Sequence, residues 1–405
     1  MAEHVGAARE PGPPEPLPWP SDPAFHRDPY PAYAQLRRSR SVGPVTLPSG
    51  LRAWAVTGFE EAWELLADPR LAKDIRRFAH LRDVALPPEL NLHMLNLDPP
   101  DHTRLRRLVT KAFTARRVEA LRPRIEQIAA ELLDAMAQQR SADLIEAFAF
   151  PLPITVICEL LGIPSGDRGD FRRWSNAVVS GRATRDELPE AVAGLIAYAK
   201  KLIAAKRAEP SDDLLSALTA ARDEDDRLSE AELISMIFLL LIAGHETTVN
   251  LIGTGTFHLL THPDQIALLR DDPSLLPSAI EELLRYDGPV EVATTRITAE
   301  PVEIAGVTIP AGEPVLVALA AVDRDPDRFP GPDRLDLTRG DAQHVAFGHG
   351  IHYCLGAPLA RMEGQIAIGA LLSRFPSLAL AVRPGDLVWR PGLLLRGLAA
   401  LPVTF

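Results

Sequence analysis

A cysteine flanked by glycines is the residue in this sequence most able to do chemistry. Cys354 lies within Phe-Gly-His-Gly-Ile-His-Tyr-Cys-Leu-Gly-Ala-Pro, residues 347–358. The glycines permit close backbone approach and unusual torsion angles, and Pro358 suits the first turn of a following helix. A thiol just before a helix N-terminus is stabilised as the thiolate, which acts as a nucleophile or as a metal ligand. Because His349 or His352 could serve as the base of a thiol nucleophile, both alternatives stay open on this loop alone.

A polar notch is predicted at the centre of the longest helix. The hexapeptide Ala-Gly-His-Glu-Thr-Thr, residues 243–248, ends an apolar run that begins at Met236. A carboxylate there needs a partner or a cavity, and a threonine hydroxyl can bond the carbonyl four residues back. Together, Glu246 and Thr247 make a polar notch in an apolar wall. His245 points roughly 100° away from its neighbours on the helix, and we expect it to have a structural role.

The pattern Phe-x-x-Gly-x-x-x-Cys-x-Gly resembles the haem-binding loop of the cytochrome P-450 superfamily. Phe347, Gly350, Cys354 and Gly356 fill its fixed places. In that family the cysteine thiolate is the axial ligand of the haem iron and favours cleavage of the O–O bond. The resemblance implies haem b (iron protoporphyrin IX) as the cofactor. It makes Cys354 the metal ligand and places Phe347, Gly348 and Gly356 in the loop that binds the cofactor.

The hexapeptide on the long helix resembles the oxygen-binding groove of the same family. By this resemblance, Thr247 holds a hydrogen-bond network next to bound dioxygen, and Glu246 admits protons to that network. Two protons must be delivered before the O–O bond can break, so an acid and a hydroxyl form a chemically sensible relay.

Four basic residues match positions that hold the haem propionates in the family. His102 and Arg106 are four residues apart, so they share one helix face and can jointly bind a propionate. Arg296 and His352 match the other propionate positions. Each of these residues alone is typical of a solvated surface side chain, but the set of four favours propionate binding.

A Glu–Arg pair, Glu282 and Arg285, lies 72 residues before the cysteine. Alone, such an i, i+3 pair is a common surface salt bridge that contributes roughly 0.2–0.5 kcal/mol. The family has a pair at this place, closed by an arginine of a Pro-Asp-Arg stretch, which Arg334 matches. The resemblance implies a buried structural network of Glu282, Arg285 and Arg334 behind the haem loop.

Basic residues are concentrated between residues 104 and 117, where no acidic residue occurs. They are Arg104, Arg106, Arg107, Lys111, Arg116 and Arg117. A nucleic-acid patch and a plain solvated helix face are the alternatives, and the net charge of −11 argues against nucleic acid. In the family, an acidic electron donor docks near this region. The resemblance therefore implies ferredoxin as partner, supplied by an NAD(P)H-dependent ferredoxin reductase.

The same resemblance predicts where the substrate lies. The pocket is expected between residues 82–95, residues 170–195, the long helix and the C-terminal segment. The side chains expected to line it are Leu95, Ile237, Leu241, Ala243, Val290, Val292 and Leu393, with Glu291 as a polar anchor. This largely apolar lining suits a lipophilic molecule of moderate size. The chain looks like tailoring enzymes of actinobacterial natural-product pathways. A macrolide or other polyketide is thus the expected substrate, and steroids, terpenes and fatty acids are alternatives.

The reaction implied is a monooxygenation, by hydroxylation or epoxidation. One atom of dioxygen enters the substrate and the other leaves as water. Two alternatives are a haem-binding recruitment module without turnover and a peroxygenase that takes oxygen from peroxide. The intact pair of Glu246 and Thr247 argues against both.

The elements that must position these residues are mostly helices. Apolar positions three and four apart predict helices over 116–139 and 189–208. The longest helix is predicted over 228–262, with a capping box at Ser229 and a stop at Pro263.

Small sheets from both chain ends complete the expected fold. A β-hairpin is predicted over residues 45–56, and β-rich segments over 302–318 and 379–405. The resemblance implies a mainly α (α+β) helical prism, with haem between the long helix and the cysteine loop. Residues 1–20 are expected to form a flexible proline-rich arm without helix or sheet, and residues 21–405 a single haem-binding domain.

Composition sets the remaining expectations. The chain is 46% hydrophobic and 24% charged, an ordinary globular balance. With 2 cysteines a disulfide framework is implausible, and Cys158, in an apolar run, is typical of a core residue. No secretory signal and no apolar run of about 20 residues is apparent. We expect a cytoplasmic monomer that binds neither membrane nor nucleic acid.

Overall fold

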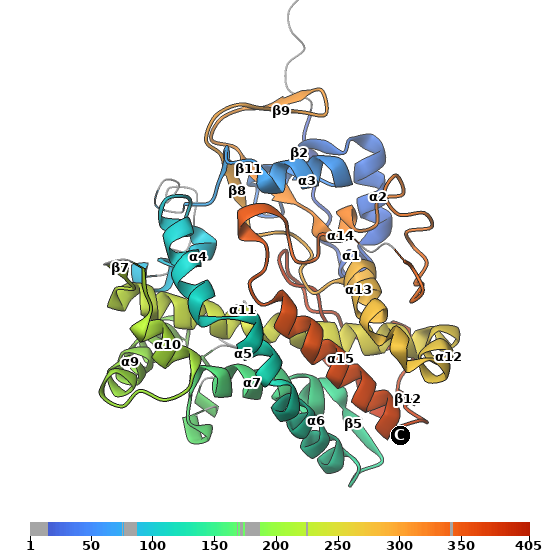
Figure 1. Ribbon diagram of the computed structural model, residues 1–405. Helices are drawn as coiled ribbons and strands as arrows, with labels where there is room; N and C mark the ends of the chain where they lie inside the picture. The colour runs from blue at the N-terminus through green and yellow to red at the C-terminus, as the bar shows by residue number, and fades with distance from the viewer. Residues whose placement is uncertain are drawn as a thin grey trace, which may run out of the picture.

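The computed structural model describes residues 15–74, 76, 87–167, 169–170, 173–174, 187–223, 226–340 and 343–405. Figure 1 shows a mainly helical part and a smaller part built around β-sheets, which confirms the expected fold class. The described helices are α1 (Pro23–Arg27), α2 (Tyr30–Ser39), α3 (Phe59–Ala67), α4 (Asp101–Ala112), α5 (Ala115–Ala120), α6 (Arg122–Met136), α7 (Pro151–Leu161), α9 (Glu187–Ala208), α10 (Leu214–Ala220), α11 (Glu230–Thr261), α12 (Pro263–Asp271), α13 (Leu276–Asp287), α14 (Leu319–Val322) and α15 (Ala357–Arg374).

The largest sheet joins four strands from the N-terminal part of the chain with two strands from residues 296–317, in the order β1-β2-β3-β11-β8-β4. These strands are β1 (Leu17–Pro18), β2 (Val42–Thr46), β3 (Arg52–Val56), β4 (Leu71–Ala72), β8 (Arg296–Thr298) and β11 (Pro314–Val317). The predicted hairpin is confirmed, because β2 and β3 pair antiparallel from Val42 opposite Val56 to Thr46 opposite Arg52. β3 also pairs in parallel with β11, so the complete sheet forms only when these distant segments of the chain come together.

The smaller sheets bear out the other β predictions in part. β9 (Val302–Ile304) and β10 (Val307–Ile309) form a hairpin, as predicted. In the C-terminal segment only β12 (Ala379–Leu380) and β13 (Pro402–Thr404) are strands, and β13 also pairs with β5 (Ser141–Asp143). A further short pair is β6 (Arg222–Asp223) with β7 (Asp226–Arg227).

The expectation that residues 1–20 form no sheet is wrong from Leu17 onward. Leu17 and Pro18 pair in parallel with β2, and the Trp19 N–H donates to the carbonyl of Thr46 at 2.9 Å. Proline is tolerated because β1 is an edge strand. The Trp19 side chain is buried and packs edge-on against Tyr33 at 5.8 Å, which fixes the segment. Residues 1–14 lie outside the described part of the chain.

The helix predicted over 116–139 is instead two helices, α5 and α6. The chain turns at Leu121, and Pro123 stands in the first turn of α6. A proline in that position cannot donate an i→i−4 hydrogen bond to the preceding turn, so it begins a new helix. The helix predicted over 189–208 is confirmed by α9.

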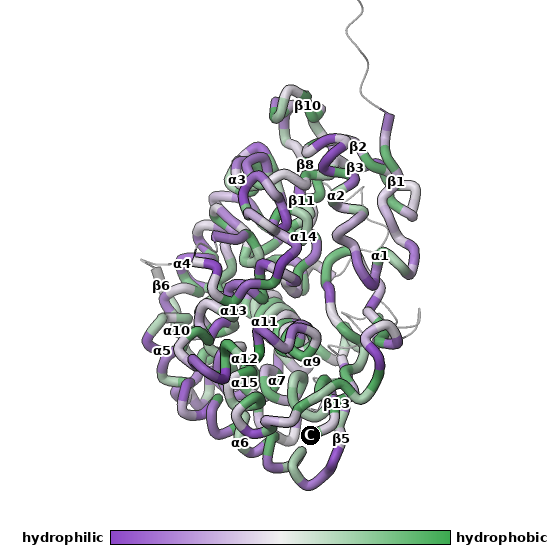
Figure 2. Tube along the Cα trace, turned by 90° about the vertical axis from the view of Figure 1, so that its right-hand side faces the viewer, coloured by the Kyte–Doolittle hydropathy of each residue, from purple (hydrophilic) through white to green (hydrophobic). Residues whose placement is uncertain are grey.

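The long helix α11 is confirmed and runs through the middle of the helical part (Figure 1). It has 32 residues, and Ser229 and Glu232 form the predicted capping box. By length and composition alone it could span a membrane, but 78% of its most apolar window is buried inside the protein. In Figure 2, hydrophobic segments gather around α11 and α7, as expected for core helices. α11 therefore forms a wall along which α7, α13 and α15 pack.

Candidate functional site

The cysteine loop is folded tightly before α15. The Cys354 N–H donates to the carbonyl of Phe347 at 2.9 Å, and Gly350–His352 forms a short 3-10 turn between them. Gly350 has a φ of 73°, and a Cβ there would lie 2.9 Å from the Cα of Ala67 on α3. The unusual torsions predicted for the loop glycines therefore occur at Gly348, with a φ of 71°, and at Gly350. They do not occur at Gly356, whose φ is −81°.

The Cys354 thiol lies among groups that favour an anion. Burial raises its pKa, while the backbone N–H groups of Gly356 and Ala357 and the guanidinium of Arg106 lower it. The balance suits a sulfur that becomes a thiolate when it binds a metal cation. Cys158 is fully buried in the core, as expected.

The two loop histidines do not act as a base for this thiol. The His349 ring stacks on Trp63 at 3.6 Å, and the His352 ring meets His102 edge-on at 4.5 Å. Within the described residues, neither imidazole hydrogen-bonds to the Cys354 sulfur. The arrangement favours a metal ligand over a thiol nucleophile.

The four predicted propionate ligands lie close enough to share one electrostatic environment. His102 and Arg106 come from α4, Arg296 begins β8 and His352 precedes the cysteine. Burial lowers the pKa of His352, and His102, Arg296 and Arg106 lower it further. Burial also lowers the pKa of Arg296 to about 10. Several basic side chains thus lie close together in one partly buried region, where charging all of them costs free energy unless an anion is present.

A dicarboxylate cofactor fits this cation cluster. His102 is buried, and within the described part of the chain neither of its ring nitrogens has a hydrogen-bond partner. Asp98 is an acid that raises the pKa of His102, but its carboxylate already accepts the backbone N–H groups of Lys73 and Asp74. The two propionates of a haem would supply the missing acceptors and charge, with Cys354 on the adjacent loop as iron ligand.

Lys73 belongs to the same cluster, although no sequence pattern indicated it. It follows β4 directly, is 8% exposed, and donates from Nζ to the Thr294 hydroxyl. Its charge lowers the pKa of both His102 and His352. Only the pairing of β4 with β8 brings it beside residues more than 200 positions away.

The predicted notch on α11 is present. The Thr247 hydroxyl donates to the carbonyl of Ala243, four residues back, at 2.9 Å. Ala243 is exposed and Thr247 half-buried, although both lie at the centre of a core helix. His245 has the expected structural role: it is fully buried, and its Nδ1–H donates to the carbonyl of Leu241 at 2.6 Å.

Glu246 binds a charged side chain from another part of the chain, whereas Thr247 bonds to the backbone of its own helix. Its carboxylate forms an ion pair with Arg390, and its second oxygen lies 3.6 Å from His245 Nε2. The Glu246 side chain is 6% exposed and that of Arg390 35% exposed, so the pair connects the helix with the surface. Sequence reasoning missed Arg390, because it lies 144 residues away in an irregular segment.

The structural network behind the loop differs from the prediction in one member. Arg285 binds both oxygens of Glu282, at 2.7 and 2.9 Å, and both side chains are fully buried. The third cation is Arg339, whose Nε lies 3.1 Å from Glu282, and not Arg334. The Arg334 side chain is 74% exposed and pairs with Asp336. The turn presents only the Arg334 carbonyl inward, where it accepts from Arg285 and Arg339.

A second ion pair, also missed, braces the loop from α13. Glu281, next to Glu282, binds Arg361 of α15 at 2.7 and 2.8 Å and His344 at 3.2 Å. These partners overcome the effect of burial and lower the Glu281 pKa to about 2. The Arg361 guanidinium also covers the Phe347 ring at 4.4 Å. The loop is therefore fixed to two helices.

The predicted pocket residues fall into different packing clusters. Ile237 and Leu241 are fully buried in the helical core, against which Leu95 packs. Val292 and Leu393 share a cluster beneath α2, and Val290 packs against the sheet and α3. Ala243 is exposed in the notch. Much of the rest of the predicted lining, residues 82–86 and most of 170–186, lies outside the described residues.

Glu291 does not have the surroundings of a substrate anchor. It is 3% exposed, and its carboxylate accepts a hydrogen bond of 2.6 Å from the Tyr33 hydroxyl. Burial raises its pKa to about 7. The carboxyl group therefore forms a buried structural hydrogen bond with Tyr33 of α2.

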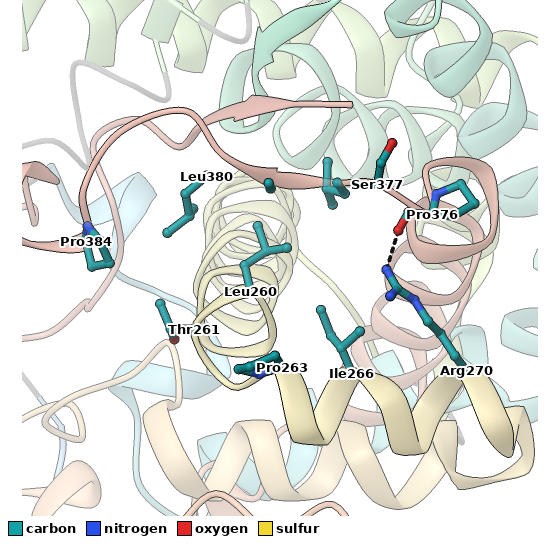
Figure 3. A pocket seen from close by; sticks show the side chains of 11 residues that line it. Leu260, Thr261, Pro263, Ile266, Arg270, Pro376, Ser377, Leu380 and Pro384 are labelled. Carbon is teal, nitrogen blue, oxygen red and sulfur yellow. Dashed lines mark hydrogen bonds between the residues drawn. The ribbon is translucent and has the colours of Figure 1, made fainter.

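Two surface grooves are distinct from this site. One, of about 440 Å³, lies between the end of α11, α12 and β12, and Figure 3 shows Leu260, Ile266 and Leu380 lining it. Its cation, Arg270, already donates to the Pro376 carbonyl at 2.6 Å. The other, of about 770 Å³, lies between α6, α13 and α15. Neither is lined by any of the seven predicted pocket residues.

The fold, the cysteine loop and the cluster of basic residues fit a haem-binding protein whose iron ligand is a thiolate. Comparison with known proteins agrees with this class. Residues 179–384 match the family model described as Cytochrome P450. Cytochrome P450 107B1 of Saccharopolyspora erythraea is 55% identical over 391 residues, which cover 94% of this chain and 96% of that protein. The 6-deoxyerythronolide B hydroxylase of the same organism is 49% identical over 392 residues, which cover 94% and 96%.

A solved structure is similar over nearly the whole chain. The tirandamycin C-bound P450 monooxygenase TamI is 51% identical with a TM-score of 0.88, and the match covers 96% of this chain and 100% of that one. The chain belongs to the cytochrome P450 family. It is a haem-thiolate monooxygenase, which requires dioxygen, electrons from redox partners and a lipophilic substrate.

Proposed function

We propose that this protein hydroxylates or epoxidises a macrolide or a related polyketide, with haem b as its cofactor. The observation that carries the haem assignment is the buried cation cluster with unpartnered His102, next to the Cys354 thiol. The substrate class rests on the relatives, one named for 6-deoxyerythronolide B and one solved with tirandamycin C. We place this monomeric enzyme in the cytoplasm.

Different residues are proposed to bind the iron and the propionates of the cofactor. Cys354 binds the iron, and His102, Arg106, Arg296 and His352 hold the propionates. When bound, haem supplies a centre that binds and reduces dioxygen. The cysteine loop that would hold the iron is braced from behind, because Arg361 of α15 covers Phe347 and pairs with Glu281 of α13.

Proton delivery is the proposed role of the α11 notch. The Thr247 hydroxyl donates to the Ala243 carbonyl, so its oxygen can still accept a hydrogen bond. Glu246 lies one position earlier and is connected through Arg390 to the surface. We propose that Glu246 takes up protons from the solvent side and that the Thr247 hydroxyl holds a proton in the notch.

The proposed electron donor is a ferredoxin, reduced by an NAD(P)H-dependent ferredoxin reductase. Of the six clustered cations, Arg104 pairs with Glu232, Arg117 pairs with Asp212, and Arg106 lies near Cys354. The side chains of Arg107, Lys111 and Arg116 are exposed, and we propose that their charges attract an acidic partner. Ile351 and Tyr353, 49% and 40% exposed, add an apolar surface next to the cysteine.

The first test is an optical titration of the purified haem protein with macrolides, other polyketides, steroids, terpenes and fatty acids. A ligand that displaces water from the iron shifts the spectrum from low spin to high spin. We expect the shift with a macrolide or polyketide at micromolar concentration, and product formation in the presence of ferredoxin and its reductase. A shift and turnover only with another class would overturn the substrate proposal. Absence of a bound haem would overturn the cofactor assignment itself.

A further inference from the structure

We propose that Lys73 is a fifth basic residue of the propionate site and that it binds a haem carboxylate with Thr294 as its support. This inference rests on the haem-binding function proposed above. It adds a residue that the cysteine loop, α4 and β8 do not supply.

The backbone around Lys73 is fixed from two directions. β4 pairs antiparallel with β8, with Ala72 opposite Ile297, and this register places Lys73 beside Arg296. The Lys73 N–H donates to Asp98 at 2.9 Å, just before α4. The Asp98 carbonyl in turn accepts the N–H of His102 at 3.0 Å. Lys73 is thus tied to both elements that carry the predicted propionate ligands.

Among the residues that the structure describes, no acidic side chain forms a salt bridge with the Lys73 ammonium group. Nζ donates to the neutral hydroxyl of Thr294, which occupies one of its three N–H donors. Burial and Arg296 lower the Lys73 pKa, and Asp98 raises it. The carboxylate of Asp98 is engaged by two backbone N–H groups. A lysine that is 8% exposed in such surroundings requires an anion to be stable as a cation.

The anion that fits is the one that the neighbouring cations also require. Lys73 lowers the pKa of His102 and of His352, and Arg296 lowers that of Lys73, so these charges act on one region. A haem has two carboxylates, and a lysine can reach one as a flexible point charge. Lys73 would therefore reduce the rate at which haem leaves and raise the reduction potential of the iron.

The test compares Lys73→Met, Lys73→Arg and a matched control, Lys200→Met, which removes an exposed cation on α9. Haem loss from each holoprotein is measured by transfer to excess apomyoglobin. A lost hydrogen bond to a charged group predicts transfer that is about 10- to 100-fold faster in Lys73→Met. Lys73→Arg should stay close to the wild type, as should the control. Thr294→Val should show a smaller acceleration.

A second measurement separates charge from structure. The reduction potential of Lys73→Met should become more negative, because a positive charge near the reducible iron is removed, and Lys73→Arg should restore it. An unchanged potential and wild-type haem retention in Lys73→Met would overturn the inference while leaving haem binding intact. Loss of thermal stability with an unchanged potential would also overturn it, in favour of a structural lysine. A wild-type protein that holds no thiolate-ligated haem would overturn the proposed function instead.

Discussion

The cysteine loop and the centre of α11 supply the two sides of the proposed site, and they are held in different ways. Behind the loop, Glu282 is bound by Arg285 and Arg339, and Glu281 by Arg361 and His344. On α11, the acid Glu246 pairs with a partly exposed arginine from an irregular segment. A metal ligand needs fixed geometry, whereas a proton carrier must be able to move. The difference teaches that buried ion pairs are concentrated behind the loop that carries the proposed iron ligand.

The largest effect should come from the ligand itself. Cys354→Ser replaces the thiolate by a weakly coordinating hydroxyl, so the thiolate-type spectrum of the reduced carbonyl complex and all turnover should disappear. Cys158→Ala, which alters a fully buried core cysteine, is the control and should keep that spectrum. A thiolate-type spectrum in Cys354→Ser would show that another residue binds the iron.

The second prediction concerns the network behind the loop. Arg339→Met leaves Glu282 short of a partner, and Glu282→Gln does the same to Arg285, so each should lower the free energy of unfolding by about 3–5 kcal/mol. Arg334→Met removes an exposed side chain and should change it by less than about 0.5 kcal/mol. Chemical denaturation followed by haem absorbance measures both. Equal losses in Arg334→Met and Arg339→Met would contradict the corrected network.

The third prediction tests the notch at the centre of α11. Thr247→Ala should retain haem but waste electrons as peroxide or water, lowering product formed per electron about 10-fold or more. Ser235→Ala, in the same helix, is the control. The measurement compares NAD(P)H consumed, product and peroxide. Coupled turnover equal to the wild type would remove the relay role and revive the peroxygenase and recruitment alternatives.

A smaller effect is expected at the surface end of the relay. Arg390→Met frees Glu246 from its ion pair and should slow product formation about 2- to 5-fold, with a changed solvent isotope effect. Arg390→Lys should largely restore the rate, because it keeps the charge. Arg383→Met removes a cation that is 86% exposed and serves as the control. An isotope effect identical in all three variants would separate Arg390 from proton delivery.

A separate, pH-dependent effect should come from Glu291, a buried carboxyl whose hydrogen-bond donor is neutral Tyr33. Burial raises its pKa to about 7, above the ordinary value of 4.5, so the folded state favours the protonated form. Its contribution to stability is complete below pH 4.5 and is lost as the pH rises through about 7. The loss is at most about 1.4 kcal/mol per pH unit. Glu291→Gln should remove this decline in thermal unfolding measured from pH 5 to 8. Parallel pH curves for variant and wild type would refute it.

Local patterns explain which predictions succeeded. The capping box of α11, the β2–β3 hairpin and the turn before α15 depend on residues a few positions apart, and their sequence signals are strong. The choice of Arg334 failed because the two arginines end consecutive turns of one irregular segment, and sequence does not say which side chain points inward. The arm prediction failed at Leu17 because proline density did not reveal that Trp19 would be buried.

The sequence by itself determined the chemistry of the site, because the cysteine loop and the hexapeptide on α11 are continuous segments whose residue types and spacing carry their function. Tertiary structure alone decided how these segments are supported. Lys73 beside Arg296, Arg390 on Glu246 and Arg339 on Glu282 are contacts between distant parts of the chain. They follow from strand register and helix packing, and charges buried by that packing must find partners wherever the fold places them.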